Sequence, residues 1–380
     1  MLKTLSNKAQ EYFYYLHQYP ELSGKEYKTT EFIVNELKKL SVFELDTQTK
    51  TGVIATINPG CDLVIGFRGD IDALEVEEKT DLEYKSKNIG IMHACGHDAH
   101  TSVMLALAHY VSSIDKLNYT IKLIFQHSEE ITPGGSSEFF ANGSLDNVNH
   151  FFSFHVEPNF PTGKILIKSG PLYASIDDFF VNVIGKGGHV ATPHFAHDPL
   201  PAACAMVSEV SNTVTKRIDP MNPPLIGIGT LQYGNGAPNT ISNDVNFCGT
   251  IRTHNSITRE KSINYLNNSI KRIAQSYDIE ALINWEHGEP VLVNDKDLVN
   301  KLEPVLIERI GANIITRLND ANYGGEDFSN YSSRKPSIYF LIGCKANEYD
   351  FHHEKFVVDV DAIPYGVELF VNIVDYYNCK

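Results

Sequence analysis

The first 170 residues alternate between amphipathic segments and short, continuously apolar ones. From Ser6 to about Leu40 apolar residues recur at mostly helical spacing, and "YPELSG" interrupts them, so two helices are predicted. Runs rich in β-branched and aromatic residues then predict buried strands: "GVIATI", "LVIGF", "IKLIFQ" and "HFFSF". Between two of these runs, "TSVMLALAHYV" predicts a helix. Strands that alternate with helices indicate an α/β domain with a largely parallel sheet.

The pattern changes after about Ala174, where apolar and polar positions begin to alternate. Strands are predicted at "DDFFVNVIG", "LIGIGTLQYG", "DVNFCGTIRT" and "EALINWEH", and helices at residues 199–214 and 259–277. The order β-α-β-β-α-β is that of a ferredoxin-like α+β domain. We therefore expect residues 175–288 to form a second domain that is inserted into the first.

The α/β pattern resumes after the insertion. Residues 299–311 predict a helix, "SIYFLIG" predicts a strand, and an amphipathic helix is expected from about Ala362 to Tyr377. The predicted fold is an α/β catalytic domain of residues 1–174 and 289–380, interrupted by the domain of residues 175–288. A chain of 380 residues is long enough for two such cores.

Composition narrows the choice of partner and compartment. The chain has 47 acidic and 32 basic side chains, a formal net charge of −15, which disfavours nucleic acid or an anionic membrane as the main partner. Because no segment is apolar over the length of a bilayer span and no signal-like stretch begins the chain, we expect a cytoplasmic protein. Its six scattered cysteines should be reduced. A small-molecule substrate is the favoured partner.

Acidic and histidine side chains follow three of the predicted strands directly. "LVIGF" leads to Asp70 and Asp72, "IKLIFQ" leads to Glu129 and Glu130, and "HFFSF" leads to His155. In open α/β sheets the functional site lies beyond the carboxyl ends of the strands. We therefore expect these side chains to meet at one edge of the sheet.

The stretch "MHACGHDAH", residues 92–100, adds a thiol and imidazoles directly before a predicted helix, where a turn can aim Cys95 and His97 at one point. Alone, each group has an ordinary alternative, such as a buried cysteine, a solvated acidic turn or a core histidine. Together, thiolate, imidazole and carboxylate groups indicate a divalent-metal site with enough ligands for two ions. Asp70 and Asp72 then suit the role of orienting a ligating imidazole.

Motifs along essentially the whole chain resemble those of the hippurate hydrolase and aminoacylase-like metallo-amidohydrolases. They are, in order, "HQYPELSGKE", "RGDIDALEVEE", "MHACGHDAHTS", "QHSEE", "FHVEP", "GKGGHVATPH", "GTIRT", "GGEDFS" and "FHHEKFVVDVDAIPYG". The resemblance implies a di-metal exopeptidase-like α/β/α catalytic domain with an inserted lid, which also forms the contact of a homodimer. It further implies two divalent metal ions per subunit, for which Zn²⁺, Mn²⁺ and Ni²⁺ all remain candidates.

The resemblance also implies roles for individual residues of the catalytic domain. Cys95 is expected to bridge two metals, and the rest of the ligand set is expected to be His97, Glu130, His155 and His352. Glu129 is expected to be the general base, which activates a water and later protonates the leaving amine.

In the lid, the resemblance implies that His189 reaches an active site across the dimer and steadies the tetrahedral intermediate. Asn239 and Arg252 match lid positions that hold the carboxylate of the substrate, and a guanidinium suits that role because it binds a carboxylate with two hydrogen bonds. The alternative for Arg252 is a surface charge at a strand end.

The expected function is metal-dependent hydrolysis of the amide of an N-acyl amino acid. The N-acetyldiaminopimelate deacetylases of lysine biosynthesis look most similar over "SGPLYAS" and from "IEALINW" to "VLVND". However, His127 and Ser128 stand where Pro-Ala is usual before the two glutamates, which leaves the acyl group and the amine open. The alternatives are a dipeptidase of the same fold, a metal-free cysteine hydrolase that uses Cys95 and His97, and a non-catalytic metal-binding or peptide-binding relative.

Overall fold

The computed structural model describes residues 1–58, 60–212, 216–234 and 236–379. The chain divides into two compact units. Unit 1 comprises Met1–Gly170, Val293–Asn319 and Asn330–Lys380, and unit 2 comprises Pro171–Leu292 and Asp320–Ser329. The segment Asp320–Ser329 belongs to unit 2 although it follows the predicted insertion. The sequence did not predict this assignment, because the segment is irregular and has no hydrophobic periodicity.

The described residues of unit 1 form an eight-stranded sheet. Its strands are β1 (Glu44–Asp46), β2 (Val53–Ile57), β3 (Val64–Asp70), β4 (Thr120–Gln126), β5 (His150–Glu157), β6 (Ile165–Ile167), β15 (Ile315–Arg317) and β16 (Ser337–Gly343), in the order β1-β2-β4-β3-β5-β16-β6-β15. The central strands β4, β3, β5 and β16 are parallel, as the apolar runs predict. Antiparallel pairs flank them on both sides.

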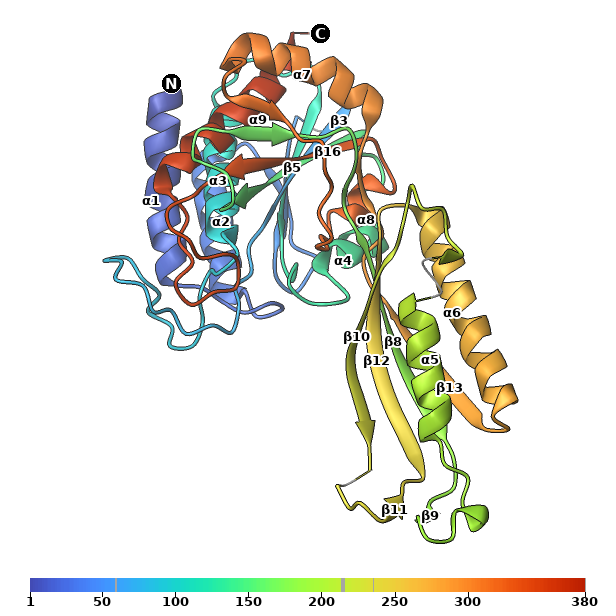
Figure 1. Ribbon diagram of the computed structural model, residues 1–380. Helices are drawn as coiled ribbons and strands as arrows, with labels where there is room; N and C mark the ends of the chain where they lie inside the picture. The colour runs from blue at the N-terminus through green and yellow to red at the C-terminus, as the bar shows by residue number, and fades with distance from the viewer. Residues whose placement is uncertain (59, 213–215, 235, 380) are drawn as a thin grey trace. The chain divides into compact units, whose positions relative to one another are not determined.

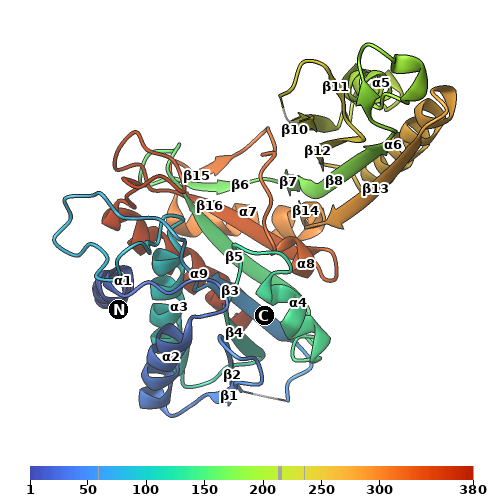
Figure 2. The ribbon, with the colours of Figure 1, turned by 90° about the horizontal axis from the view of Figure 1, so that it is seen from below.

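Helices cover both faces of this sheet (Figure 2). The helices on one face share the main apolar core with the sheet, and they are α1 (Leu2–Gln18), α2 (Tyr27–Leu40), α3 (His97–Ser112), α7 (Lys296–Ile310) and α9 (Ile363–Asn378). The other face carries α4 (Gly135–Ala141) and α8 (Ser329–Ser332). The alternation of β5 separates the two faces: Phe152 and Phe154 lie in the main core, whereas Phe151 contacts Phe140 and Tyr331.

The strand register brings three carboxyl ends to the same level of the sheet. Asp70, the last residue of β3, pairs with Gln126, the last residue of β4. Phe67 of β3 pairs with Phe152 of β5, so Asp70 lies at the level of His155. The loops that follow these strands therefore begin at one edge of unit 1.

The described part of unit 2 contains a four-stranded antiparallel sheet in the order β10-β12-β8-β13. Its strands are β8 (Ser175–Ile184), β10 (Leu225–Tyr233), β12 (Asp244–Thr253) and β13 (Glu280–His287), and α5 (Leu200–Asn212) and α6 (Ser256–Ser276) pack on one face (Figure 1). This order of elements is the predicted β-α-β-β-α-β order. Residues 213 and 214 of the predicted first helix lie outside the described residues.

The remaining elements are short and have no clear sequence pattern. They are β7 (Gly170–Tyr173), β9 (Gly188–His189), β11 (Thr240–Ile241), β14 (Leu292–Asn294) and the 3₁₀ turns at Pro193–Phe195 and Val360–Ala362. Strand β9 pairs with β11, and β7 pairs with β14. Within the described ranges, none of the helices combines the length and the apolar character that a membrane span requires.

Candidate metal centre

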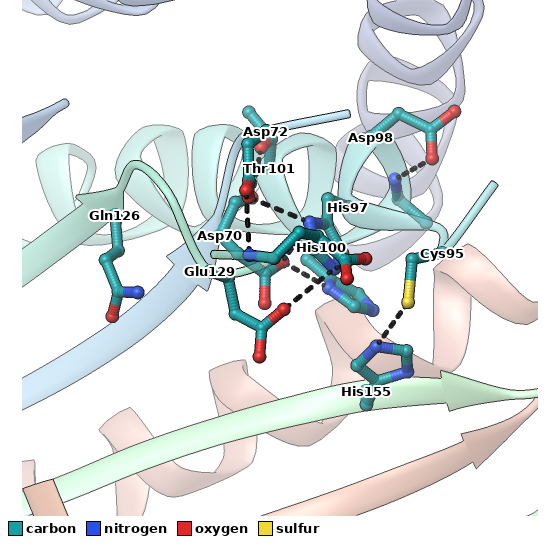
Figure 3. A network of polar contacts seen from close by, with 12 residues as sticks. Asp70, Asp72, Cys95, His97, Asp98, His100, Thr101, Gln126, Glu129 and His155 are labelled. Carbon is teal, nitrogen blue, oxygen red and sulfur yellow. Dashed lines mark hydrogen bonds and ion pairs between the residues drawn. The ribbon is translucent and has the colours of Figure 1, made fainter. Parts of the chain in front are cut away.

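The predicted ligands of unit 1 converge at the carboxyl edge of its sheet. Figure 3 shows Cys95 and His97, at the start of α3, facing His155 on β5. The Sγ atom of Cys95 lies 3.4 Å from Nε2 of His155. Glu130, in the loop after β4, has its Oε1 atom 3.8 Å from Nε2 of His97 and 3.4 Å from Nε2 of His352. Four separate parts of the chain thus contribute side chains to one cluster.

Cys95 belongs to two groups of candidate ligand atoms within this cluster. One group is Cys95, His97 and His155, and the other is Cys95, Glu130 and His352. Within each group the ligand atoms all lie within 4.8 Å of one another. A thiolate shared by two such groups has the arrangement that a bridge between two metal ions requires.

The backbone at the start of α3 explains how residues two apart face one centre. Gly96 adopts φ +85, a left-handed conformation that a glycine adopts without steric cost. A Cβ atom at this position would lie 2.4 Å from Cγ2 of Val156, so the turn also packs directly on β5. The His352 loop is fastened beside this turn, because the His352 N–H donates to the carbonyl of Ala94 at 2.8 Å.

Hydrogen bonds on the outer nitrogens turn two imidazoles toward the centre. Nδ1 of His97 lies 3.1 Å from Oδ1 of Asp72, and Nδ1 of His155 lies 2.6 Å from the carbonyl oxygen of Val156. Because each Nδ1–H donates outward, each Nε2 keeps its lone pair for a ligand. Such hydrogen bonds to the remote nitrogen are the usual support of a histidine that binds a metal.

Two polar atoms at the centre of the cluster lack hydrogen-bond partners among the described residues. They are Nε2 of His97 and Oε1 of Glu130; both atoms are buried, and Oε1 has its ion-pair contact with His352 but no hydrogen bond. Unpaired polar atoms are costly inside a protein, whereas an imidazole lone pair and a carboxylate oxygen that face one another would both be satisfied by a cation. The residues present therefore fit a metal centre.

His100 also lies in the cluster but is not available as a ligand. Its Nε2 accepts the Val156 N–H at 3.0 Å, and its Nδ1 lies 2.5 Å from Oδ1 of Asp70. Asp70 in turn pairs at 2.5 Å with Arg68, which is fully buried. Asp70 thus supports His100 and Arg68, while Asp72 is the carboxylate that bonds to His97.

The pKa shifts of the clustered side chains favour a bound cation. Burial and the charge of Glu130 raise the pKa of the Cys95 thiol well above its usual range. Burial lowers the pKa of His155 well below its usual value. Burial also opposes the charge of His97, but Asp70 and the other anionic partners raise its pKa overall. A cysteine nucleophile without a metal needs a lowered thiol pKa, so the environment of Cys95 disfavours the metal-free alternative.

Glu129 belongs to neither group that contains Cys95, although its carboxylate forms a further candidate group with His97 and Glu130. Its Oε2 atom is 4.0 Å from Nε2 of His97, and its side chain is 12% exposed. A carboxylate that borders a metal centre without completing the ligand set can exchange a proton with a substrate or a water.

The three predicted residues of unit 2 lie in two separate places. His189 pairs with Thr240, and the carbonyl of Asn239 accepts the Val190 N–H at 3.1 Å, so these two residues are neighbours. Arg252 is near the other end of β12, which begins at Asp244. Eight residues of extended strand separate Asp244 from Arg252, roughly 26 Å at 3.3 Å per residue. Within one unit 2, Asn239 and Arg252 therefore do not reach the same group.

Two further buried polar residues lie around the centre, and the sequence alone assigns neither of them a role. Arg68 donates to Gln126 at 3.0 Å as well as to Asp70. His93 is buried, neither of its ring nitrogens has a hydrogen-bond partner among the described residues, and burial lowers its pKa to about 4. His93 is one of the histidines of the "MHACGHDAH" stretch, which marks it as part of the cluster without giving it a role. Arg68 directly follows the predicted strand "LVIGF", but that position alone does not show that its side chain is buried.

Comparisons with known proteins agree with this geometry. The profile described as peptidase family M20/M25/M40 matches residues 66–376. An N-acetyl-L-cysteine deacetylase of Bacillus subtilis is 34% identical over 92% of this chain and 83% of its own length. An N-acetyldiaminopimelate deacetylase of Listeria innocua is 33% identical over 95% of this chain and 96% of its own length.

A solved structure extends the likeness to three dimensions. The YXEP protein of Bacillus subtilis, a dinuclear metal-binding peptidase of the M20 family, is 30% identical to this chain. The two chains superpose with a TM-score of 0.84, and the match covers 99% of each. The predicted α/β fold and the predicted family are thereby confirmed. The chain belongs to peptidase family M20/M25/M40.

Proposed function

We propose that the protein is a metal-dependent amidohydrolase that cleaves the amide bond of N-acyl amino acids, and of N-acetyl amino acids in particular. The observation that carries the proposal is the shared position of Cys95 in two ligand groups, with Glu129 beside them. The relatives named as deacetylases of N-acetyl-L-cysteine and of N-acetyldiaminopimelate support the choice of substrate class.

The proposed cofactor is a pair of divalent ions per subunit. Cys95 would bridge them, and the other ligands would be His97, His155, Glu130 and His352. When bound, such ions supply Lewis acidity, which polarises an amide carbonyl and lowers the pKa of water. The thiolate favours Zn²⁺ or Ni²⁺, and Mn²⁺ remains a candidate because its availability in a cell also decides occupancy.

Glu129 would move the proton that the reaction requires. Its carboxylate accepts a proton from the attacking water, whose oxygen forms the new bond to the carbonyl carbon. The same proton then passes to the amide nitrogen as the C–N bond breaks, so a carboxylic acid and a free amine leave. The side chain is mostly buried beside His97, which limits exchange of that proton with bulk water.

Unit 2 would act as a lid and as the contact of a homodimer. Arg252 would bind the carboxylate of a substrate, while His189 would donate to the oxyanion in the active site of a second subunit. Asn239, the neighbour of His189, would help to hold the substrate carboxylate in that second site. The separation of Arg252 from the other two residues within unit 2 supports a division of their roles between two subunits. The cytoplasmic location stays a prediction from the sequence.

A peptidase is the second candidate, because the structurally similar YXEP protein is described as a peptidase. The two candidates differ in the amine of the substrate: a dipeptidase requires a free α-amino group, whereas an aminoacylase requires that it be acylated.

The test is a substrate panel for the purified protein: N-acetylcysteine, N-acetyl-L,L-diaminopimelate, N-acetylmethionine, hippurate and free dipeptides. We expect hydrolysis of at least one N-acyl amino acid, at a kcat/KM well above that for any free dipeptide. Turnover of free dipeptides alone would support the peptidase and refute the proposal. Absence of activity on N-acetyl-L,L-diaminopimelate would exclude the role in lysine biosynthesis.

A further inference from the structure

Glu26 is a buried carboxylate far in sequence from every residue of the candidate centre. It is 0% exposed and occupies the position directly before α2. A carboxylate at the start of a helix ordinarily accepts N–H groups of the first turn, but the Glu26 side chain makes no such bond. Glu21 supplies one instead, through a bond of 2.8 Å from the Thr29 N–H to its Oε2 atom. The burial of Glu26 therefore needs a reason other than capping of α2.

The contacts of Glu26 lead to the loop that carries the proposed base. Its Oε1 atom accepts the backbone N–H of Ser128 at 2.9 Å and that of Gly24 at 2.8 Å. Ser128 directly precedes Glu129 and lies 102 residues from Glu26. The bond thus joins the start of α2 to the loop after β4.

The conformation of Ser128 shows why this loop needs fixing. Ser128 has φ +53, in the left-handed region that residues other than glycine rarely adopt. Its carbonyl accepts the Gly135 N–H at 3.0 Å, and its N–H is the group that Glu26 accepts. An unfavourable local conformation persists only when surrounding interactions determine it.

A second buried carboxylate holds the other side of Glu129. Oδ2 of Asp72 accepts the Glu130 N–H at 3.0 Å. The residues before and after Glu129 therefore each donate their backbone N–H to a fully or almost fully buried carboxylate. Asp72 also bonds to His97, so this side of the loop is joined to the ligand set.

We propose that Glu26 is a positioning residue: through the Ser128 N–H it fixes the turn that aims Glu129 at the reacting water and Glu130 at the metal centre. The inference rests on the proposed function, in which Glu129 is the base and Glu130 a ligand. Because Glu26 acts through an oxygen that accepts backbone N–H groups, a neutral side chain of the same shape that keeps this oxygen should serve almost as well.

The test compares two variants whose side chains match that of Glu26 in length. Glu26→Gln keeps an oxygen that can accept the Ser128 N–H, whereas Glu26→Met keeps the volume without an acceptor. The matched control is Glu21→Met, which removes the bond to Thr29 at the start of α2 but leaves the Ser128 loop untouched. The measurements are kcat and KM on the best N-acyl amino acid, the thermal midpoint, and Co²⁺ affinity from its absorption spectrum without substrate.

We expect Glu26→Met to lower kcat and Co²⁺ affinity by about 10-fold to 100-fold each, with KM changed less than about 3-fold. Glu26→Gln should keep at least about half of both values, and Glu21→Met should change neither by more than about 2-fold, even where it lowers the thermal midpoint. Equal kcat and Co²⁺ affinity in Glu26→Met and Glu21→Met would overturn the inference. Equal damage in Glu26→Gln and Glu26→Met would overturn it as well.

Two measurements test the inference even if no substrate is hydrolysed or if Glu26→Met does not fold. If no N-acyl amino acid is hydrolysed, the proposed function fails, but the Co²⁺ titration of the same variants still tests Glu26. If Glu26→Met does not fold, hydrogen exchange on the wild-type protein decides. The amides of Ser128 and Glu130 should then exchange at least about 100-fold more slowly than in an unstructured chain. Unprotected exchange at both amides would contradict the two carboxylate bonds.

Discussion

Asp72 joins three parts of the candidate centre through one carboxylate. Its Oδ1 atom lies 3.1 Å from Nδ1 of His97, and its Oδ2 atom accepts the Glu130 N–H at 3.0 Å and the Ser23 hydroxyl at 2.7 Å. Burial opposes its ionisation, but these hydrogen bonds lower the pKa of Asp72 overall. The carboxylate stays charged at neutral pH and aligns an imidazole with the loop that carries Glu130.

The role of Glu129 can be tested by a change of one atom. Glu129→Gln should lower kcat by about 10²-fold to 10⁴-fold, because an amide cannot accept the proton, while metal content stays at the wild-type value. Kinetics and metal analysis on the same sample measure both quantities. The matched control is Glu138→Gln on α4, a half-exposed glutamate that pairs with His127. A Glu129→Gln enzyme within about tenfold of wild-type kcat would contradict the assignment.

His17 predicts a loss of stability at alkaline pH. Its ring is buried and lies 2.6 Å from Asp98 and 3.3 Å from Glu78, with Tyr84 packed against it. Burial lowers the pKa of His17, but the two carboxylates raise it by more than burial lowers it, so that the pKa is about 9. Because the folded pKa exceeds the unfolded one, the stabilisation is complete below about pH 6.5 and is lost as pH rises through about 9.

Urea unfolding of wild type and His17→Gln at pH 6, 7.5 and 10 measures this effect. The wild type should be the more stable at pH 6, by an amount on the order of 3 kcal/mol, and the difference should shrink toward pH 10. A difference that does not depend on pH would show that His17 contributes only packing.

At the scale of the elements, the turn before α3 places both Cys95 and His97. Gly96→Ala should destabilise the protein by about 2–4 kcal/mol, because it combines an unfavourable φ of +85 with a Cβ atom 2.4 Å from Val156. It should also weaken metal binding, since the turn aims both ligands. Urea unfolding and Co²⁺ titration measure the two effects.

Gly90→Ala is the matched control for that turn. Gly90 has φ +77, but a Cβ atom there would meet nothing within 4 Å. Its substitution should cost only about 1 kcal/mol and leave the affinity for metal unchanged. Equal losses in the two variants would mean that the contact of Gly96 with β5 is not what positions the ligands.

Periodicity predicted the long elements of this fold well. β12, β13 and β16 have the bounds that their apolar patterns indicate: β16 is buried at every residue, whereas most of β13 alternates between partly buried and exposed residues. β6 and β15, with three residues each, and α4, with seven, are too short to show a period. Their positions depend on neighbours far along the chain, as in the pairing of β6 with β15.

The part of the candidate site that lies at the ends of strands could be predicted from the sequence. Asp72, Glu130 and His155 follow strands whose parallel order could be inferred, so their meeting could be expected. Glu26 could not be found in this way, because a charged residue that is buried against distant partners has the same local sequence as one on the surface. Arg68 directly follows the predicted strand "LVIGF", but its pairing with Asp70 and Gln126 depends on the folded structure. The left-handed conformation of Ser128 likewise depends on the folded loop and not on residue type.

At the scale of the whole molecule, the placement of residues in unit 2 predicts an enzyme that works as a dimer. His189 pairs with Thr240, shortly before β12 begins, whereas Arg252 lies near the end of β12, so we propose that they serve active sites of different subunits. His189→Ala and Arg252→Ala should each be strongly impaired alone. Refolded together, they should recover about a quarter of wild-type activity, because half of the dimers then contain one intact site.

Mixtures with Cys95→Ala control for this result. With His189→Ala it should also recover about a quarter of the activity, whereas with Arg252→Ala it should recover none, because Arg252 is then missing from every subunit that binds metal. Activity assays and the sedimentation coefficient of each mixture measure the outcome. A monomeric enzyme, or mixtures that never exceed the sum of their parts, would contradict the proposed exchange.

Metal reconstitution of the purified protein is the most direct test of metal-dependent hydrolysis at the Cys95 centre. Activity on N-acyl amino acids is recorded before chelation, after chelation, and after Zn²⁺, Mn²⁺, Ni²⁺ or Co²⁺ is added back, and bound metal is counted in each sample. We expect activity to disappear with the metal and to return as two ions bind per subunit, and we expect Cys95→Ser to bind fewer ions. Full activity in a metal-free sample would contradict this expectation.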